Sequence, residues 1–490
     1  MSASGKDGEC GILACAAYLP RGRIARETLE EATGWVTGMG RRSSGTRHFA
    51  NWDEDSITMA VEAARHALQR MSDEPTSEVA SLNLATTTAP FADRSNAGIV
   101  REALNLNADL SPADRGGSRR AATSALIDLW ARRQSGPHLL CAADCIDALP
   151  ASDGERDLGH GAAAVVIGAG NPVARIRAAA ARHEDFVDRY RESGTRFEYR
   201  LEPRWTRDAG TVSQLHDLIG QVLAEADTAA TDIKAFLSPL PPDAERAVLR
   251  AAGLTQCVTA APLRDSVGTC GSAHPLVMLS WALESAEPGD QLLLIGAGQG
   301  FDVLLIEASG GASDDPMSVG RQLAAGRTES NYVRYAALRG LLPVETGLRG
   351  ERDTRTAHSA HYRRHSDLTG FNGGRCVACG KLQFPRSRIC VHCHADGMQT
   401  PESLAGLTGT VNSFTEDWLA YSPRPPLMFG NIHFPDGANV MMEFSDFLPG
   451  EIETGQSVRM AFRIKDIDTR RHFRRYFWKP VPLAGEQSGG

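Results

Sequence analysis

The chain has 490 residues, of which 42% are hydrophobic and 23% are charged, and its formal net charge is −8. These values are typical of an ordinary globular protein with two to four domains. The acidic balance gives no electrostatic reason to expect nucleic acid or an anionic membrane surface as a partner, and we expect neither.

The sequence also carries no sign of export or membrane insertion. The first nine residues lack an apolar signal core, and no run of about 18 apolar residues occurs. Six of the 10 cysteines lie in apolar or glycine-rich runs, which fits a reducing cytoplasm better than a disulfide-dense scaffold. These are Cys10, Cys15, Cys141, Cys145, Cys257 and Cys270. We therefore predict a cytoplasmic protein.

Residues 11 to about 309 alternate between strand-like and helix-like segments, which predicts buried sheets covered by helices. The predicted strands are Gly11–Leu19, Leu82–Thr88, His138–Ala143, Ala162–Gly168, Ala235–Ser238, Gln291–Gly296 and Asp302–Glu307. The predicted helices are Ser56–Met71, Asn96–Leu106, Ser118–Arg133, Val212–Ala226, Asp243–Ala252 and His274–Ser285. In Ser118–Arg133 the helical period places Ala122, Leu126, Leu129 and Trp130 on one face.

The order of these segments predicts two successive α/β halves, residues 1–170 and 171–309, joined near Asn171-Pro172. Residues 310–370 change in character and are predicted to be a linker with one short helix around Tyr332–Leu342. A zinc ribbon is predicted at 371–403, and an all-β region of about five strands at 404–483. Residues 484–490 are predicted to be a flexible tail.

Two cysteine pairs give the most specific signal in the chain. Cys376-Val-Ala-Cys379 is followed ten residues later by Cys390-Val-His-Cys393, and four thiolates at this spacing suit one tetrahedral Zn²⁺. Since protein would fill all four positions, the zinc would be structural and not catalytic. An alternative interpretation takes Cys390-Val-His-Cys393-His394 as a c-type haem site, but it leaves the upstream pair unexplained.

The all-β region after the ribbon suggests an OB-type barrel. In its strand-like runs, Phe434-Pro-Asp-Gly437 is a turn signal. OB barrels often bind nucleic acid, and a basic cluster interleaved with aromatic residues could hold phosphate and stack a base. However, residues 404–483 contain nine Arg or Lys and nine Asp or Glu, so their charges cancel. We favour a terminal strand with one solvated face for this cluster, Arg470, Arg471, Arg474 and Arg475 with His472, Phe473, Tyr476, Phe477 and Trp478.

A glycine-rich run, Ile295-Gly-Ala-Gly-Gln-Gly300, looks like a dinucleotide-binding loop. The run is followed by the strand-like Phe301–Glu307, so no helix N-terminus is present to hold a pyrophosphate. We interpret it as a strand–turn–strand whose glycines allow close backbone approach.

Several segments together resemble two known families. The first set of segments is Gly11-Ile-Leu-Ala, Ala17-Tyr-Leu-Pro-Arg, the run beginning Asp53-Glu-Asp-Ser-Ile-Thr, Gly159-His-Gly-Ala-Ala-Ala and Val267-Gly-Thr-Cys-Gly-Ser-Ala-His-Pro-Leu. Through them, about residues 8–309 are similar to the thiolase superfamily, and within it to 3-hydroxy-3-methylglutaryl-CoA synthases and type III ketoacyl synthases. The second set is Gly374-Arg-Cys-Val-Ala-Cys-Gly, Gln383-Phe-Pro-Arg and Tyr476-Phe-Trp-Lys-Pro, and through it the remainder is similar to the acyl-CoA-associated zinc-ribbon/OB-fold family.

The resemblance implies a five-layered α/β/α/β/α domain over residues 1–309, usually dimeric, that acts on thioesters of CoA or of an acyl carrier protein. A rubredoxin-like ribbon and an OB-type barrel would follow it and help to form or cover the acyl-CoA site. The expected partners are therefore an acyl-CoA or acyl-carrier protein and a second copy of the chain.

The residues that such enzymes use are missing at the matching positions. Working members use a Cys nucleophile at a helix N-terminus, a His, and an Asn or second His. Counting back from Leu126 places Arg119 at the Cys position, and a slip of one residue gives Ser118. Ser238 stands in place of the His, and Thr269 stands in place of the Asn. An arginine stays protonated and cannot be an acyl nucleophile, and a serine without an adjacent base is a poor one.

Four of these residues keep both a functional and a structural interpretation. Arg119 at a helix start is unfavourable by about 0.3–1 kcal/mol, which suggests an anionic partner such as Asp114, a substrate carboxylate or a CoA phosphate; otherwise it points to solvent. Ser118 is most simply an N-cap residue. Cys270 is either a relocated nucleophile or a buried thiol, and His274 either belongs to the site or packs at a helix start.

Three functional hypotheses follow. The first is an enzyme on acyl thioesters with a non-standard site, an acyltransferase or a C–C lyase, in which Arg119 polarises a carbonyl or orients an acid group. There Ser238 and Thr269 would donate hydrogen bonds. The second is a non-catalytic acyl-CoA-binding scaffold that partners an active thiolase-like enzyme. The third is a conventional Claisen-type synthase that uses Cys270.

Overall fold

The computed structural model describes residues 10–37, 44–71, 79–132, 136–310 and 315–483. The predicted tail at 484–490 and the N-terminal nine residues lie outside this part of the chain. The structure divides into two compact units, and the division falls within helices α2 (Ser56–Arg70) and α3 (Asn96–Ala103). The first unit is Met1–Ala50, Ala63–Gly98 and Asn107–Tyr332; the second is Asn51–Glu62, Ile99–Leu106 and Val333–Gly490.

The first unit is built on one ten-stranded sheet that consists of two similar halves. The first half has the strand order β5-β4-β6-β7-β1, and the second has the order β8-β14-β13-β11-β12. In each half, two antiparallel pairings are followed by two parallel pairings toward the outer edge. The bridge between Ile12 and Ala174 joins the halves. The first half contains β1 Cys10–Tyr18, β4 Ser81–Ala85, β5 Pro112–Arg115, β6 His138–Asp144 and β7 Gly161–Ala169; the second contains β8 Ala174–His183, β11 Ile233–Leu237, β12 Val258–Thr259, β13 Gln291–Ala297 and β14 Gly300–Ala308.

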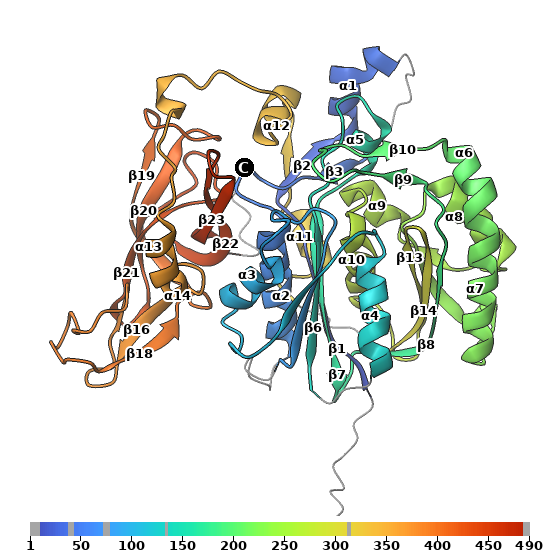
Figure 1. The fold of residues 1–490 in the computed structure, drawn as a ribbon, viewed down its shortest axis with the longest axis horizontal. Helices are drawn as coiled ribbons and strands as arrows, with labels where there is room; N and C mark the ends of the chain where they lie inside the picture. The colour runs from blue at the N-terminus through green and yellow to red at the C-terminus, as the bar shows by residue number, and fades with distance from the viewer. Residues whose placement is uncertain (1–9, 38–43, 72–78, 133–135, 311–314, 484–490) are drawn as a thin grey trace, which may run out of the picture. The chain divides into compact units, whose positions relative to one another are not determined.

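Helices complete the layers of this unit (Figure 1). Helices α4 (Ala121–Arg132) and α10 (His274–Leu283) lie between the two sheet halves, and their apolar residues share one buried cluster with both. Helices α7 (Val212–Glu225) and α8 (Pro242–Ala251) cover the outer face of the second half. The part of α2 that belongs to this unit covers the first half, which gives the α/β/α/β/α order of layers.

The remaining elements of the first unit are short. A three-stranded sheet has the order β15-β2-β3, and β9 pairs with β10 in a hairpin. The bounds are β2 Gly22–Ala25, β3 Thr46–His48, β9 Arg189–Tyr190, β10 Tyr199–Arg200 and β15 Arg327–Glu329, with α1 Arg26–Thr37, α5 Asp153–Asp157, α6 Pro203–Trp205, α9 Ala261–Val267 and α11 Val319–Ala324. Helix α12, Tyr332–Leu338, starts at the last residue of this unit and belongs mainly to the second.

All the strands and helices predicted for residues 11–309 are present, with bounds that shift by a few residues, and Arg133 at the end of one predicted helix lies outside the described residues. Within α4, Ala122, Leu126 and Leu129 are buried and Trp130 packs against the same cluster, as its period predicts. The sequence analysis missed β8, because its run of alanines has the composition of a helix. Pairing with β14 along its whole length fixes it as a strand.

The segment predicted to be a linker contains more structure than one helix. Val319 is fully buried at the start of α11, and Ser318 caps this helix by accepting a hydrogen bond from the Arg321 N–H. The following strand β15 pairs with β2 in parallel. Two further helices occur later, α13 His358–Arg363 and α14 His365–Leu368.

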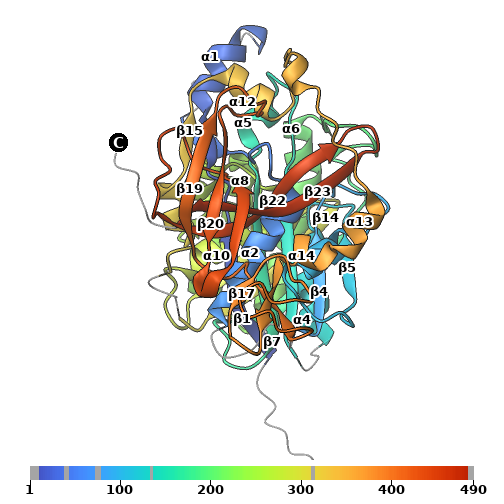
Figure 2. The same ribbon diagram turned by 90° about the vertical axis from the view of Figure 1, so that its left-hand side faces the viewer.

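The second unit contains two sheets, whose strands are labelled in Figures 1 and 2. A three-stranded sheet of order β17-β16-β18 forms the predicted ribbon, and a five-stranded antiparallel sheet of order β21-β20-β19-β22-β23 follows. The five strands match the predicted number, and Pro435–Gly437 forms the predicted turn between β20 and β21. The bounds are β16 Asn372–Cys376, β17 Leu382–Gln383, β18 Gln399–Ser403, β19 Gly409–Asp417, β20 Leu427–His433, β21 Asn439–Glu443, β22 Ser457–Asp468 and β23 Phe473–Pro482.

Within the part of the chain that the structure describes, no helix is both long and apolar enough to cross a bilayer.

Candidate functional site

A buried carboxylate, Asp144, organises the loops at one end of the first unit's sheet. It is the last residue of β6, is fully buried, and accepts six hydrogen bonds of 2.7–3.1 Å. The donors are the hydroxyls of Thr86, Thr87, Thr88 and Ser272 and the backbone N–H groups of Thr87 and Ser272. Asp144 therefore ties the loop after β4 to the loop before α10, at the carboxyl end of parallel strands, where α/β proteins commonly bind ligands.

Arg119 lies at this end of the sheet, two residues before α4. Its guanidinium is paired with the carboxylate of Glu198, and the two side chains are only 11% and 10% exposed. Arg200 donates from Nε to the other oxygen of the same carboxylate, Oε1, at 2.5 Å. Burial lowers the pKa of Arg119 to about 9, with Arg189 acting in the same direction and Glu198 opposing, so Arg119 remains a cation at neutral pH. Burial alone would raise the pKa of Glu198, but Arg119 and Arg200 outweigh it and leave that pKa lowered.

A chain of contacts connects this ion pair to Thr269. Arg200 Nη1 lies 3.4 Å from the carboxylate of Asp157, and the Asp157 carbonyl accepts a hydrogen bond of 2.7 Å from the Thr269 N–H. Thr269 is half-buried. The structure therefore brings Arg119 and Thr269, two of the predicted site residues, into one connected set.

Ser118 has a structural role in this arrangement. Its hydroxyl donates to the carbonyl of Gly298 at 2.9 Å and accepts from the Arg120 N–H at 3.3 Å, close to the predicted N-cap role. Gly298 lies in the hairpin between β13 and β14, so the strand–turn–strand interpretation of the glycine-rich run is confirmed. A Cβ on Gly298 would lie 2.6 Å from the Ser118 hydroxyl, which explains why a glycine is needed there.

Cys270 and His274 are both fully buried. Burial, with a smaller contribution from Asp144, raises the pKa of the Cys270 thiol, so little thiolate is present at neutral pH. Burial also lowers the pKa of His274 to about 3, with Arg264 acting in the same direction, so its ring is neutral. Neither ring nitrogen of His274 has a hydrogen-bond partner.

Ser238 follows the end of β11 and is also buried. Its hydroxyl accepts from the Leu240 N–H at 3.2 Å, and Arg264 donates to the Leu240 carbonyl at 3.1 Å. Ser238 and His274 therefore share Arg264 as a neighbour, but the described contacts do not connect them to the pair of Arg119 and Glu198.

One predicted partner of Arg119 is wrong. Asp114 instead caps α3, by accepting from the N–H groups of Asn96 and Ala97 at 2.9 and 2.7 Å. Sequence reasoning missed Glu198, which lies 79 residues from Arg119 in the sequence, because nothing local marks the pairing. The signal for Asp144 was present, since a charged residue at the end of a fully buried strand is unusual.

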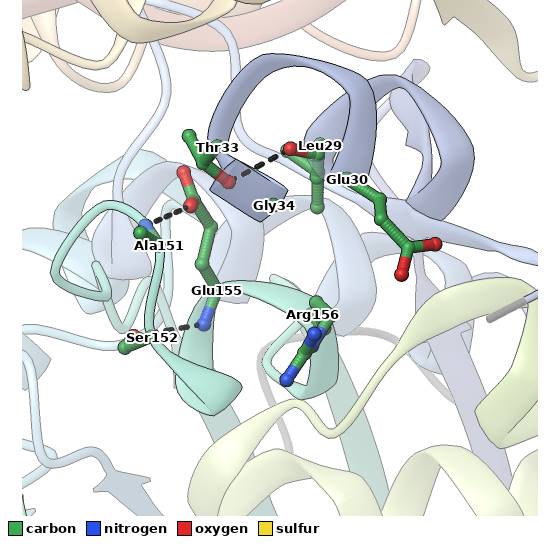
Figure 3. Close-up of a pocket in the computed structure, with 8 residues that line it drawn as sticks. All are labelled: Leu29, Glu30, Thr33, Gly34, Ala151, Ser152, Glu155 and Arg156. Atoms are coloured by element: carbon green, nitrogen blue, oxygen red, sulfur yellow. Dashed lines mark hydrogen bonds between the residues drawn. The ribbon is translucent and has the colours of Figure 1, made fainter. Parts of the chain in front are cut away.

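Two cavities stand out among the described residues, and none of the predicted site residues lines either. The first is about 10 Å³, room for one water, and lies between α1 and α5 (Figure 3), where Glu155 accepts from the Ala151 N–H at 2.7 Å. The second is about 250 Å³ and lies on the ribbon. Its lining residues are Arg386, Ser387, Arg388, Gly397 and Gln399.

The four predicted zinc ligands converge in the second unit. The sulfurs of Cys376, Cys379, Cys390 and Cys393 all lie within 4.8 Å of one another, with Cys376–Cys393 and Cys379–Cys390 separations of 3.7 and 3.8 Å. Four sulfurs placed 2.3 Å from a common tetrahedral centre would be about 3.8 Å apart, so the set fits Zn²⁺.

The two cysteine hooks of the ribbon have the same local geometry. Gly380 and His394 follow them with φ of +73° and +61°, and their N–H groups bond to the carbonyls of Cys376 and Cys390. His394 thus occupies the turn position that Gly380 occupies in the first hook. The haem alternative is therefore not supported, because both hooks belong to one cluster.

The basic cluster near the C-terminus pairs with acidic residues. Arg471 pairs with Asp468 and Arg475 with Asp466, while Arg474 lies 2.8 Å from Asp55. Among the interleaved aromatic residues, Tyr476 is 4% exposed and Trp478 is fully buried. Three of the four arginines and two of the rings are thus engaged in the fold, as expected for a terminal strand.

The ribbon matches a known family model. Residues 372–399 match the model described as ChsH2, rubredoxin-like zinc ribbon domain. The match contains all four cysteines of the cluster.

The larger part of the chain is similar to hydroxymethylglutaryl-CoA synthases of archaea. The protein of Methanopyrus kandleri is 28% identical over 299 residues, which are 59% of this chain and 84% of the relative. That of Methanothermobacter thermautotrophicus is 28% identical over 341 residues, 66% of this chain and 96% of the relative.

Solved structures show the same fold. A 3-oxoacyl-(acyl carrier protein) synthase III, FabH, from Pseudomonas aeruginosa PAO1 aligns with a TM-score of 0.53 at 20% identity over 62% of this chain and its own full length. An HMG-CoA synthase complexed with CoA aligns with a TM-score of 0.57 at 15% identity, over 71% of this chain and 95% of its own. The chain thus has homologues among the hydroxymethylglutaryl-CoA synthases, carries a thiolase-like fold, and contains a rubredoxin-like zinc ribbon of the ChsH2 type.

Proposed function

We propose that this protein binds acyl thioesters of CoA or of an acyl carrier and processes them without an acyl-cysteine intermediate, as an acyltransferase or a C–C lyase. The observation that carries the proposal is Arg119. At the helix start where the resembled enzymes hold their nucleophile, this chain has a buried cation paired with Glu198. The homologues named above are supporting, since one of the similar structures is an HMG-CoA synthase with CoA bound.

A guanidinium suits either of two tasks in such chemistry: it can orient an acid group of the substrate, or it can stabilise a carbonyl oxygen. When a bond next to a thioester carbonyl breaks, negative charge develops on the carbonyl oxygen, and a preorganised cation in a site that excludes water stabilises it. In this proposal, Thr269 and Ser238 would also donate hydrogen bonds to the substrate. Asp144 would keep the loops of Thr86–Thr88 and Ser272 in place.

A second candidate, a non-catalytic acyl-CoA-binding scaffold, is favoured by one observation. The two cavities lie away from the site, and Glu198 occupies the position in front of Arg119. A synthase that uses Cys270 is disfavoured by the burial of that thiol and by its raised pKa.

The test is incubation of the full chain with a panel of acyl-CoAs, with intact-protein mass and free thiol read together. We expect thiol release or substrate cleavage without a protein adduct, retained in Cys270→Ala and lowered by about 10²–10³-fold in Arg119→Gln. A covalent adduct that maps to Ser118 or Cys270 would contradict the proposal. Bound CoA without turnover would favour the scaffold.

Zinc would hold the ribbon together in this scheme, and no step of the chemistry needs it. Dimerisation through the thiolase-like part and a cytoplasmic location also remain predictions. Light scattering of the purified chain checks whether it is a dimer.

A further inference from the structure

Two arginines clamp the carboxylate of Glu198 as they would clamp a bound acid. Arg119 Nη2 contacts Oε2, while Arg200 Nε contacts Oε1 at 2.5 Å, so each carboxylate oxygen has its own guanidinium. The carboxylate is largely shielded from solvent. Charge-assisted hydrogen bonds to both oxygens are the usual means by which arginine recognises a carboxylate.

Glu198 reaches this clamp from a segment that is weakly anchored. Residues 184–201, here called the strap, connect β8 to α6 and carry the hairpin of β9 and β10. None of the residues 184–200 is fully buried. A segment with so little buried surface opens at a low free-energy cost.

The strap is tied down mainly by polar contacts. Arg191 donates to the Thr87 carbonyl at 2.5 Å, and Arg196 lies 2.9 Å from the carboxylate of Asp147. Arg200, besides holding Glu198, contacts Asp157. Ion pairs as exposed as these contribute little to stability.

The ends of the strap are better fixed than its middle. The ring of Phe186 stacks on Trp205 at 4.6 Å, and the Leu201 N–H bonds to the Asp188 carbonyl at 2.9 Å. Arg200 adjoins Leu201 at a fixed end, so the Glu198 side chain can swing away from the two arginines as the middle of the strap loosens, while Arg200 stays.

Other carboxylates near Arg119 are not free to take this role. Asp144 is saturated by its six hydrogen bonds and belongs to a buried strand. Once the Glu198 side chain swings out, Arg119 and Arg200 would face a ligand without their counter-ion, and an anionic group would bind there in its place.

We infer that Arg119 and Arg200 form a carboxylate-binding subsite, that Glu198 is its tethered occupant, and that the ligand is an acyl thioester whose acyl chain ends in a carboxylate. The thioester part of this inference rests on the proposed function; the subsite itself rests on the clamp and the strap alone. Binding of the acidic acyl group displaces Glu198 and opens the strap.

The first experiment is titration calorimetry of the full chain with succinyl-CoA and with butyryl-CoA, which has an uncharged acyl chain of the same length. Glu198→Ala empties the subsite, and we expect this variant to bind succinyl-CoA about ten- to a hundred-fold more tightly than the parent chain does. Its affinity for butyryl-CoA should change several-fold less. In Glu198→Ala with Arg119→Gln, the preference for the acidic chain should disappear.

Arg196→Ala is the matched control, because it loosens the strap without emptying the subsite. Because Glu198 still occupies the clamp, Arg196→Ala should leave the affinity for butyryl-CoA unchanged and change that for succinyl-CoA far less than Glu198→Ala does. If Glu198→Ala shifts both affinities equally, the subsite is overturned while thioester binding stands.

The second experiment needs no thioester. Hydrogen exchange of residues 184–201 is measured with succinate and with sodium chloride at the same ionic strength. Succinate should increase strap exchange beyond the chloride control in the parent chain, and Arg119→Gln should remove this increase. If no thioester binds to any variant, the proposed function fails, and the exchange experiment with succinate still tests the subsite. Equal exchange of residues 184–201 in succinate and in chloride would overturn the subsite.

Discussion

Two ion pairs, one in each unit of the chain, are anchored in different ways. In the first unit, the cation Arg119 is neutralised by a glutamate on a strap without a fully buried residue. In the second unit, Lys479 of β23 is 3% exposed and lies 3.0 Å from Asp53, which is fully buried, and 4.3 Å from the ring centre of Trp52. The first pair has one partner on a segment without a fully buried residue, whereas both partners of the second are buried.

The charged groups of the second unit come from a short acidic segment and from the strands that cover it. Arg463 of β22, fully buried, contacts both Glu54 and Asp446 at 3.2 and 2.9 Å. The carboxylate of Glu62 accepts from Arg459 and from the Phe462 N–H. The acidic partners Asp53, Glu54 and Glu62 are themselves buried, at 0–4% exposed, so we expect these pairs to act in stability and not in binding.

The largest effect is expected where the second unit depends on a metal. Chelation of zinc, or Cys379→Ser, should unfold the ribbon, because metal binding of such sites is worth about 10 kcal/mol or more. Zinc content by mass spectrometry should fall from about one per chain toward zero. Unchanged zinc content in Cys379→Ser would contradict the four-cysteine site, and Cys257→Ser is the control.

Next in size is the loss of a buried pair. Asp53→Ala leaves Lys479 buried and without its nearest counter-ion, and we expect it to lower the free energy of unfolding by about 3–5 kcal/mol. Asp466→Ala, whose partner Arg475 is 30% exposed, should cost at most about 1 kcal/mol. Urea unfolding, followed by a spectroscopic signal from the second unit, measures the change in the free energy of unfolding for both variants. Equal changes would show that the two kinds of pair do not differ.

An effect that appears only at acid pH is expected from His274 in the first unit. Its pKa is lowered to about 3, so the folded state keeps the ring neutral while the unfolded state binds a proton below pH of about 6.5. Stability should therefore fall as the pH drops from about 6.5 toward 3, by up to about 1.4 kcal/mol per pH unit for this one proton. His48, whose pKa is lowered to about 4, adds to the same slope. Unfolding of His274→Phe across this range should show a slope smaller by up to one proton, and an unchanged slope would contradict the assignment.

The smallest effect is expected at Cys270. Because the thiol is buried and its pKa is raised, iodoacetamide should leave it unmodified in the folded chain, as peptide mapping can show. Cys270→Ala should keep turnover of the panel within about twofold of the parent, since no bond to sulfur forms in the proposed reaction. Labelling of Cys270 with loss of turnover would restore the conventional synthase.

The difference between the units also explains what could be predicted from the sequence. The zinc site was predicted because its four ligands lie within 18 residues, and spacing alone fixes their geometry. The helices and strands of the first unit followed from hydrophobic periodicity. The alanine-rich β8 was missed because only its partner β14 makes it a strand.

The candidate site was predictable only in part. Arg119 was recognised by its match to the nucleophile position of the resembled family. Of the anionic partners suggested for it, Asp114 is close in the sequence but caps another helix. Glu198 is brought to Arg119 by the strap, and the length of that segment gives no signal of where it folds. Asp53 pairs with Lys479 across 426 residues, and a pairing at that separation leaves no periodicity to read.

One consequence of the second unit's make-up concerns how this chain could be divided. The unit is discontinuous: it takes Asn51–Glu62 and Ile99–Leu106 from the middle of the thiolase-like sequence. A gene fragment that encodes only the ribbon and the following strands would lack Asp53, Glu54, Asp55 and Glu62, and would leave Arg463 and Lys479 without acidic partners from that segment. The two parts are thus interlaced along one polypeptide, and a recombination event that exchanged the C-terminal part alone would carry over only one side of this charge pairing.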